Sequence, residues 1–164
     1  MSFRVGHGFD AHRLAEGRPL MLGGVLIPFD RGLVGHSDGD CLAHAVCDAI
    51  LGAAGEGDMG AHFPSSDVRW KNASGETFVR EVARLIGPRH AIENVDATVI
   101  GEAPRLAPHL EKMRETIARA LGVPATRVSI KAKSTDELGA LGRGEGIAAH
   151  AVALLRVNDA PHDQ

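Results

Sequence analysis

The sequence lacks several features that would point to common classes of protein. It contains no tyrosine, so phenol chemistry is not available to it, and it has only two cysteines in 164 residues. Cys41 and Cys47 lie six residues apart in one predicted helix, which is too few for a disulfide framework and wrongly spaced for a C-x-x-C site. We therefore expect a reducing compartment, with both thiols acting as small buried apolar groups.

Long apolar runs and an excess of basic charge are also missing. No run approaches the ~18 apolar residues that a membrane span needs, and the start of the chain, Met1–Gly6, does not resemble a signal peptide. The formal net charge of −3 argues against a nucleic-acid surface, which normally carries a basic excess. We expect a cytoplasmic globular protein that binds neither membrane nor nucleic acid.

Glycine and histidine are the residues that the sequence has in quantity. There are 20 glycines and nine histidines. Five of the histidines fall within the first 62 residues: His7, His12, His36, His44 and His62. Because aspartates lie beside them, this cluster raises the odds of a metal site.

Periodicity and capping signals divide the chain into strands and helices. Strands are expected near residues 3–9, 20–28, 94–99, 127–132 and 147–157, the second being a hairpin or a bent strand broken at Gly23 and Gly24. Helices are expected from a cap at Ser37 or Asp38 to about Ala54, from a cap at Ser74 to about Ile86, and over residues 110–121. Residues 58–73 show no clean period and are expected to form a loop.

The mixture of these elements indicates the fold class. Strands interspersed with three helices, without strict βαβ alternation, predict a single α+β domain with helices packed on one face of a mixed β-sheet. We expect this domain to cover residues 1–157 and residues 158–164 to form a flexible tail.

The strongest candidate chemistry in the sequence is a metal site. Asp10 and His12 lie on one face of an extended segment, because successive side chains of a strand alternate. Asp40, His44 and Asp48 recur every four residues along one side of a helix. A histidine from this stripe could complete a three-ligand set with an open fourth position, which is typical of catalytic zinc. The alternative is an ordinary solvated polar face.

A second pattern suggests nucleophilic catalysis. Residues 35–39, G-H-S-D-G, match the G-x-S-x-G nucleophile elbow with Ser37 as the nucleophile. Short patterns recur by chance in glycine-rich chains, the preceding strand is weak, and the chain is small for an α/β-hydrolase. A helix-capping turn with anion contacts is the favoured interpretation.

A third pattern suggests phosphate binding. Residues 139–146 contain four glycines and Arg143, although they match neither the P-loop nor G-x-G-x-x-G. Their backbone N–H groups, with the side chains of Lys131, Lys133, Ser134 and Thr135, could bind phosphate oxygens. The alternative is a turn at a crowded subunit contact. Together these patterns favour phosphate chemistry at a metal, without a base-activated side-chain nucleophile.

Eight segments that occur in order across nearly the whole chain carry a family resemblance. They are G-H-G-F-D-A-H (6–12), G-G-V-L-I-P (23–28), H-S-D-G-D-x-x-x-H (36–44), G-D-M-G (57–60), F-P-S-S-D (63–67), N-V-D-A-T-V-I (94–100), E-A-P-R-L-x-P-H (102–109) and G-R-G-E-G-I-A (142–148). The chain closely resembles the 2-C-methyl-D-erythritol 2,4-cyclodiphosphate synthase family of the non-mevalonate isoprenoid pathway.

The resemblance implies an activity and an assembly. Family members are phosphorus–oxygen lyases that cyclise 4-diphosphocytidyl-2-C-methyl-D-erythritol 2-phosphate to 2-C-methyl-D-erythritol 2,4-cyclodiphosphate and release CMP. They form homotrimers with active sites between subunits. A serine hydrolase using Ser37, or a non-catalytic trimeric metal-binding protein, are the alternatives.

The resemblance also implies roles for particular residues. Zn²⁺ would be held by Asp10, His12 and His44, and Mg²⁺ or Mn²⁺ at the diphosphate by Asp136, with Glu137 as its neighbour. His36 and Ser134 would contact the reacting phosphates. The full set of implied substrate contacts is Asp10, Ala11, His12, His36, Ser37, Asp58, Met59, Gly60, Phe63, Pro64, Ser65, Ser66, Asp67, Gly101, Glu102, Ala103, Pro104, Arg105, Leu106, Ala107, Lys133, Ser134, Thr135, Asp136, Ala140 and Arg143.

Within this set the family grips the ribose at positions matching Asp58 and Gly60, and the cytosine with the backbone of residues 101–107. Some positions depart from the family pattern. Asp136 stands where glutamate is usual, Ser65 where an aspartate contacts the erythritol part, and Ala140 where an aromatic residue often lines the trimer cavity. Ser134 replaces a threonine and keeps its hydroxyl.

Overall fold

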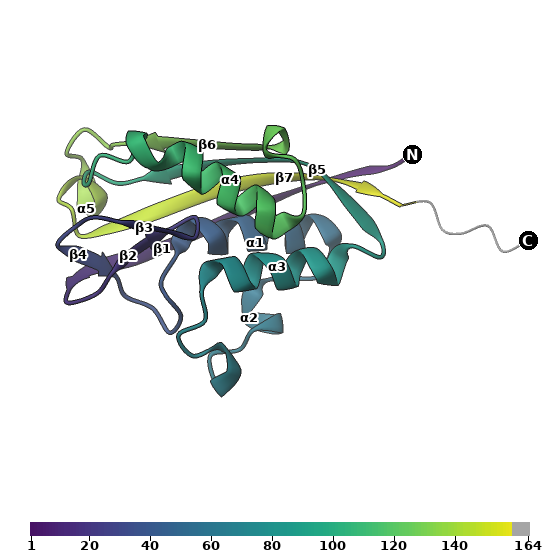
Figure 1. Ribbon diagram of the computed structural model, residues 1–164, viewed down its shortest axis with the longest axis horizontal. Coiled ribbons are helices and arrows are strands. Elements are labelled where there is room, and N and C mark those ends of the chain that lie inside the picture. The colour runs from purple at the N-terminus through teal and green to yellow at the C-terminus, as the bar shows by residue number, and fades with distance from the viewer. Residues whose placement is uncertain (159–164) are drawn as a thin grey trace, which may run out of the picture.

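In the computed structural model, which describes residues 1–158, a mixed five-stranded sheet carries its helices on one face (Figure 1). The strands are β1 (Phe3–Glu16), β4 (Arg31–Leu33), β5 (His90–Ile100), β6 (Val128–Lys133) and β7 (Gly146–Val157). Their order is β4-β1-β7-β5-β6, with β5 and β6 parallel and the other pairs antiparallel. The predicted α+β class is confirmed.

The predicted hairpin is present beside this sheet. Strands β2 (Leu20–Leu22) and β3 (Val25–Ile27) pair antiparallel on either side of Gly23 and Gly24. The stretch 58–73 contains a one-turn helix, α2 (Met59–His62), and a 3₁₀ turn at Val68–Trp70.

Three longer helices form the second layer: α1 (Cys41–Ala54), α3 (Gly75–Ile86) and α4 (Leu110–Leu121). Helix α1 packs on β1 and β7, α4 packs on β6, and α3 contacts both helices. Short 3₁₀ turns occur at Ala107–His109 and Ala125–Arg127, and a one-turn helix, α5, at Gly139–Gly142. Ser74 caps α3 by accepting the Thr77 N–H at 3.2 Å, as predicted.

The cap of α1 differs from the prediction of Ser37 or Asp38. Asp40 caps this helix, and its carboxylate accepts the Ala43 N–H at 3.0 Å. The same carboxylate accepts the N–H groups of Gly23 and Gly24 at 2.8 and 2.7 Å. Three backbone donors therefore converge on a side chain that is 0% exposed. Asp40 fastens the β2–β3 hairpin to α1 and does not lie on a solvated helix face.

Two other aspartates near α1 also hold backbone. Asp38 accepts the N–H of Gly75, the first residue of α3, at 2.8 Å. Asp48 accepts the N–H of Met59, the first residue of α2, at 2.8 Å. Both side chains therefore tie neighbouring elements to α1.

Glycines on β1 allow α1 to approach the sheet closely. A Cβ atom added to Gly8 would lie 1.9 Å from the Ala45 carbonyl oxygen, and one added to Gly6 would lie 2.0 Å from that of Ala49. Only a residue without a side chain fits such contacts. Because strand side chains alternate, Asp10 and His12 follow on the same face of β1, toward the start of α1.

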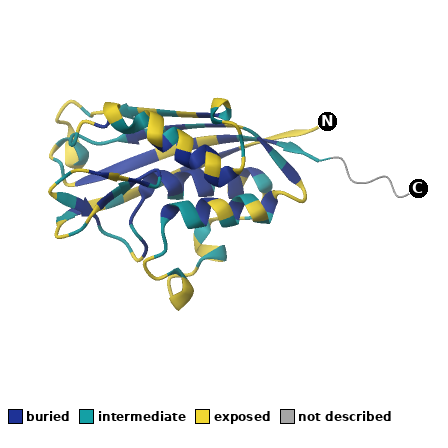
Figure 2. Cartoon of the chain, in the orientation of Figure 1, coloured by how far each residue is buried: buried dark blue, intermediate teal, exposed yellow. Residues whose placement is uncertain are grey.

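The two faces of the sheet differ in burial. Helix α1 and the strand residues beneath it are buried (Figure 2). Cys41 and Cys47 are fully buried and free, and burial raises the pKa of both thiols well above the ordinary value. On the opposite face the side chains of Phe3, Val5 and Phe9 are 53%, 69% and 52% exposed.

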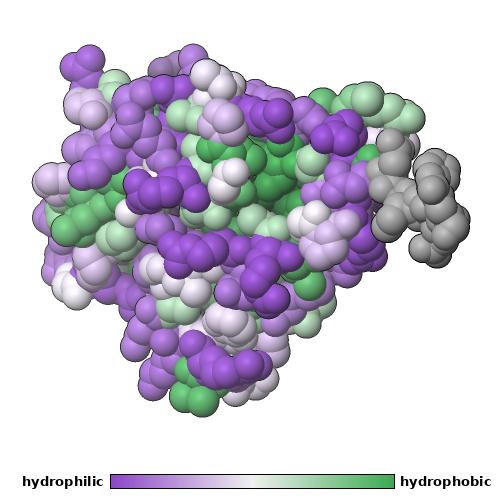
Figure 3. Space-filling model, turned by 45° about the vertical axis from the view of Figure 1, so that its right-hand side comes forward, coloured by the Kyte–Doolittle hydropathy of each residue, from purple (hydrophilic) through white to green (hydrophobic). Residues whose placement is uncertain are grey.

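Figure 3 shows a face on which hydrophilic side chains frame apolar ones. A hollow lined by both apolar and polar residues, among them Ile86, Leu121 and Arg127, lies where the ends of α3 and α4 meet the start of β5. Among residues 1–158, no helix has the length and apolar character needed to cross a membrane. Apart from Asn158, the predicted tail lies outside the described residues.

Candidate active site

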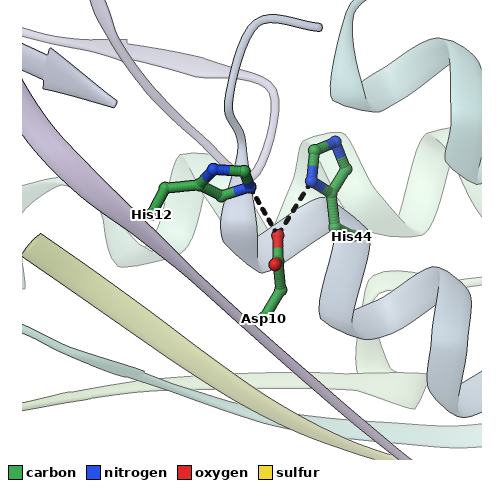
Figure 4. Close-up of side chains that lie close together, drawn as sticks. All are labelled: Asp10, His12 and His44. Atoms are coloured by element: carbon green, nitrogen blue, oxygen red, sulfur yellow. Dashed lines mark hydrogen bonds and ion pairs between the residues drawn. The ribbon is translucent and has the colours of Figure 1, made fainter. Parts of the chain in front are cut away.

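Asp10, His12 and His44 converge where β1 meets the first turns of α1 (Figure 4). One carboxylate oxygen of Asp10, Oδ2, lies 2.8 Å from His12 Nε2 and 2.9 Å from His44 Nδ1. Each residue offers one donor atom, and the three atoms lie within 4.8 Å of one another. The structure thus brings together the three residues that the sequence predicted as metal ligands.

The close contacts within the cluster favour the ionised form of Asp10 and the protonated form of His12. Burial works against ionisation of Asp10, but the close contacts and charges of His12 and His44 outweigh it and hold the pKa of this carboxyl well below its usual range. The close contact with the Asp10 carboxylate raises the pKa of His12 above its ordinary value, against the effect of burial. A carboxylate is therefore held between two imidazoles.

The donor set fits a divalent metal ion. His12 Nε2 is buried and has no partner with hydrogen-bond geometry, although Asp10 Oδ2 is only 2.8 Å away. A buried polar atom without a partner is costly, and a metal ion would satisfy it. Two nitrogen donors and one oxygen donor are typical of zinc sites that keep a fourth position open. The cluster is a candidate site for a divalent metal.

Ser37 lies next to the cluster, and its contacts match those of a Ser-His-Asp triad except that the aspartate is shared with a second histidine. Its Oγ is 3.2 Å from His44 Nε2, and the other nitrogen of that ring faces Asp10. Asp10 contacts His12 just as closely, and a Ser-His-Asp triad has no use for this fourth group. Ser37 is only 7% exposed, and its hydroxyl also accepts the Gly39 N–H at 3.3 Å.

A hollow of about 170 Å³ opens beside the cluster. It is lined by His12, His36, Ser37, His44, Met59, Phe63, Ser65, Trp70 and Phe78. Phe63 forms an aromatic wall with Trp70 and Phe78, at ring-centroid distances of 5.0 and 5.1 Å. Sequence reasoning placed neither Trp70 nor Phe78 at the site. The sequence offered one indication: Trp70 is the one tryptophan of the chain, and it lies in a stretch with neither helical nor strand periodicity.

A second hollow, of about 270 Å³, gathers most of the predicted nucleotide contacts. It is lined by Gly101, Glu102, Pro104, Arg105, Leu106, Ala107, Ala132, Lys133 and Ser134. The two hollows share no lining residue. Strand β6, which leads into the second hollow, lies three strands away from β1 in the sheet, a separation of roughly 14 Å at the usual strand spacing.

Other predicted site residues make local contacts outside both hollows. Asp58 caps α2 by accepting the Ala61 N–H at 3.0 Å, and Asp67 pairs with Arg69 at 2.6 Å. Thr135 donates to the Leu138 carbonyl oxygen at 2.8 Å. Arg143 pairs with Glu145 at 2.7 Å. Ala11, Gly60, Pro64, Ser66, Ala103 and Ala140 line neither hollow.

The predicted second-metal carboxylates lie on a turn of unusual backbone conformation. Asp136 and Glu137 have φ values of 51° and 64°, in the left-handed region. Ser134 donates a hydrogen bond to the Asp136 carboxylate at 3.3 Å. The Glu137 backbone N–H donates to the Glu102 carboxylate at 3.5 Å. The turn thus places Asp136 beside the hydroxyl that was predicted to contact phosphate.

Comparison with known proteins shows similarity along nearly the whole chain. A family model described as the YgbB family matches residues 3–156. A 2-C-methyl-D-erythritol 2,4-cyclodiphosphate synthase from Burkholderia lata is 55% identical over 156 residues, 94% of this chain and 97% of that protein. One from Geotalea uraniireducens is 56% identical over 153 residues, 93% of this chain and 98% of that protein.

Solved structures show the same similarity in three dimensions. A structure of 2C-methyl-D-erythritol-2,4-cyclodiphosphate synthase in a CDP-bound form superimposes with a TM-score of 0.86 at 38% sequence identity. The match covers 93% of this chain and 100% of that chain.

Proposed function

The chain belongs to the YgbB family, and we propose that it cyclises 4-diphosphocytidyl-2-C-methyl-D-erythritol 2-phosphate to 2-C-methyl-D-erythritol 2,4-cyclodiphosphate, releasing CMP. The observation that carries this proposal is the Asp10–His12–His44 cluster, within a chain more than half identical to proteins named for that synthesis. Such an enzyme acts as a phosphorus–oxygen lyase. Its two cysteines are buried and free, which suits the reducing cytoplasm as its location.

The reaction needs no side-chain nucleophile. An oxygen of the 2-phosphate attacks the β-phosphorus, and a new P–O bond forms. The bond from the β-phosphorus to the bridging oxygen breaks, and CMP leaves with the electron pair. Because the attacking oxygen is already anionic, no general base is required. Positioning and charge neutralisation are then the main resources for catalysis.

Residues from both hollows supply these resources. His36, beside the metal cluster, and Ser134, in the second hollow, would donate hydrogen bonds to phosphate oxygens. Lys133 adds positive charge next to Ser134. Residues 101–107 would hold the cytosine by their backbone, and Asp58 and Gly60 the ribose. Fixed donors of this kind stabilise the charge of the transition state.

The metal ions belong to the same proposal. Asp10, His12 and His44 would hold Zn²⁺, and Asp136 would contribute to a Mg²⁺ or Mn²⁺ site at the diphosphate. When bound, these ions supply Lewis-acid polarisation and a template for the phosphates. Asp10 is prepared for such a role because its two imidazole neighbours keep it ionised.

Two observations support a homotrimer with active sites between subunits. Pockets for small molecules typically measure about 300–1,000 Å³, and the two hollows measure about 170 and 270 Å³. Neither is large enough for the whole nucleotide-linked substrate, and they lie apart in the sheet. The apolar side chains on the open face of the sheet suit contact with another copy. In a ring, the metal half of one subunit can meet the nucleotide half of the next.

The test is direct. Purified, metal-replete protein is incubated with the proposed substrate and Mg²⁺, and CMP is measured by chromatography and the cyclic diphosphate by ³¹P NMR. We expect both products in equal amounts, and chelation of the metal should stop the reaction. Absence of CMP from metal-replete trimer would end the proposal. Labelling of Ser37 by a fluorophosphonate, with indifference to chelators, would instead favour a hydrolase.

A further inference from the structure

The two imidazoles of the metal cluster use opposite ring nitrogens. His12 presents Nε2 to Asp10, whereas His44 presents Nδ1. A neutral imidazole that binds a metal through one nitrogen carries its proton on the other. The site therefore requires His12 protonated on Nδ1 and His44 protonated on Nε2, which are two different tautomers.

Each of these remaining nitrogens faces an oxygen. His12 Nδ1 lies 2.6 Å from the carbonyl oxygen of Val34. Because a carbonyl can only accept, this nitrogen must carry the proton. His44 Nε2 lies 3.2 Å from Ser37 Oγ, whose hydroxyl oxygen can accept an N–H. Both oxygens, one from the backbone and one from a side chain, belong to the four-residue segment Val34–Ser37, so one short segment contacts both ligands.

Arg18 holds this segment through hydrogen bonds to its backbone. The Arg18 Nε donates to the Leu33 carbonyl oxygen at 2.8 Å. Its Nη2 donates to the carbonyl oxygens of Gly35 and Ser37 at 3.4 and 3.5 Å. One guanidinium thus bonds carbonyl groups at three alternate positions, and the Val34 N–H bonds the Arg13 carbonyl oxygen at 2.9 Å. The planar fork of arginine suits this arrangement, which a lysine could not reproduce.

We propose that residues 34–37, held by Arg18, form a clip that fixes the tautomers and ring orientations of the two histidine ligands. The Val34 carbonyl sets His12, the Ser37 hydroxyl sets His44, and Arg18 keeps both oxygens in place. Ser37 and Arg18 are therefore positioning residues for the metal site. The inference rests on the proposed function only in that the cluster binds a divalent metal. Hydrogen-bond partners of this kind tune metal affinity in other proteins.

The first experiment measures zinc affinity of the Ser37→Ala variant by competition with a chelator, without substrate. We expect affinity to fall about 10- to 100-fold, because the His44 Nε2–H loses its acceptor. Ser37→Thr keeps a hydroxyl and should restore affinity to near the wild-type value. Ser65→Ala, which removes another hydroxyl from the same hollow, should keep zinc affinity. Wild-type affinity in Ser37→Ala would overturn the role of Ser37.

The second experiment acts on the clip from outside the cluster. Arg18→Met removes the guanidinium without touching a ligand, and zinc affinity should fall about 10-fold, the lower end of that range. Arg31→Met is the matched control, since Arg31 donates to the Gly144 carbonyl oxygen at 2.9 Å, away from the segment. Equal zinc affinities in the two arginine variants would overturn the role of Arg18.

A spectroscopic readout separates positioning from general stability. In zinc-loaded protein, ¹⁵N NMR should show His12 protonated on Nδ1 and His44 protonated on Nε2. The same tautomer in both rings would overturn the clip. The metal-free Ser37→Ala variant should unfold at the wild-type temperature. If its unfolding temperature falls enough for general destabilisation to explain the weaker zinc binding, the positioning role of Ser37 is refuted.

Failure of this inference can be told apart from failure of the proposed function. Wild-type protein that binds zinc, shows the clip effects and releases no CMP would refute the function alone. Protein that releases CMP while Ser37→Ala binds zinc normally would refute the clip alone.

Discussion

The two halves of the proposed active site differ in how far a single chain completes them. The metal half holds Asp10, His12 and His44 through contacts of 2.8 and 2.9 Å, beside a buried helix. The nucleotide half depends on longer contacts, such as that of 3.3 Å from Ser134 to Asp136, on exposed side chains. One half is ordered by the fold, and the other presents its groups at the border of the sheet.

The cause of the difference lies in the position of the strands. Strand β1 is an inner strand, paired on both sides, and α1 lies directly on it. Strand β6 is an edge strand, and it runs into a polar turn with two consecutive left-handed residues, Asp136 and Glu137. The inner strand supplies rigid side chains, whereas the edge strand supplies a surface that a neighbouring copy can complete.

Loss of a metal ligand should have the largest effect. His44→Ala should lose stoichiometric zinc and with it all measurable CMP release, because only two donors remain. His36→Ala is the matched variant, since His36 lines the same hollow but lies outside the ligand cluster. It should keep zinc and lose about 10²–10³-fold in turnover, as for removal of one transition-state donor. Metal analysis after dialysis, with the CMP assay, distinguishes the two. Zinc retained in His44→Ala would show that the third ligand is wrong.

Mixing two inactive variants tests whether the halves come from different subunits. His44→Ala damages the metal half and Ser134→Ala the nucleotide half, so each homotrimer should be nearly inactive. Random co-assembly should place intact halves together in about a quarter of the sites, and CMP release should recover to about that share of wild type. Activity that stays at the level of the parents would place both halves in one chain.

Some of the site follows from local sequence rules. Asp10 and His12 share a face because strand side chains alternate. Helix α1 ends at Gly55, as expected of a glycine, and the residue has the left-handed φ of 77° that such an end requires. The close approach of α1 that brings His44 to them depends on Gly6 and Gly8, which are visible in sequence only as two glycines.

Other features depend on contacts that no local pattern contains. The segment H-S-D-G-D offers three residues able to cap α1, and the choice of Asp40 is made by the N–H groups of Gly23 and Gly24, some 16 to 17 positions away. The aromatic wall containing Trp70 comes from a stretch too short and irregular to show a period. Family resemblance names many residues of the two hollows, though not Trp70 or Phe78, and the separation of the hollows within one chain is a property of the strand order.

A substitution that pushes α1 away from β1 should lower the zinc affinity of the metal half, but by less than the loss of a ligand does. In Gly8→Ala the new Cβ would lie 1.9 Å from the Ala45 carbonyl oxygen, a backbone atom that cannot turn aside. We expect the free energy of unfolding to fall by about 1–3 kcal/mol, as in overpacked cores, and zinc affinity to fall with it.

Gly52→Ala is the matched control for this prediction. It adds the same methyl group to the exposed side of α1, where the nearest atom lies 3.9 Å away. Because alanine favours helix, this variant should gain about 0.5–1 kcal/mol. Urea unfolding of the metal-free protein and zinc competition measure both effects. Normal zinc affinity in a destabilised Gly8→Ala variant would show that the position of α1 on β1 does not determine the geometry of the metal site.

The smallest effect is expected at the turn of the nucleotide half, where Asp136 and Glu137 compete for the second metal. Asp136→Asn keeps a side chain that tolerates the left-handed backbone, so the turn should persist while one carboxylate charge is lost. Because Mg²⁺ takes only one or two protein carboxylates beside substrate phosphates, the Mg²⁺ concentration for half-maximal CMP release should rise several-fold. Glu137→Gln should change this Mg²⁺ concentration less, since of the two carboxylates Asp136 is the one that contacts the Ser134 hydroxyl.

Zinc content should stay at the wild-type level in both variants, because neither side chain belongs to the metal half. The reverse order of effects would assign the second metal to Glu137, and a loss of zinc in either variant would mean that the two halves are less independent than their separate hollows indicate.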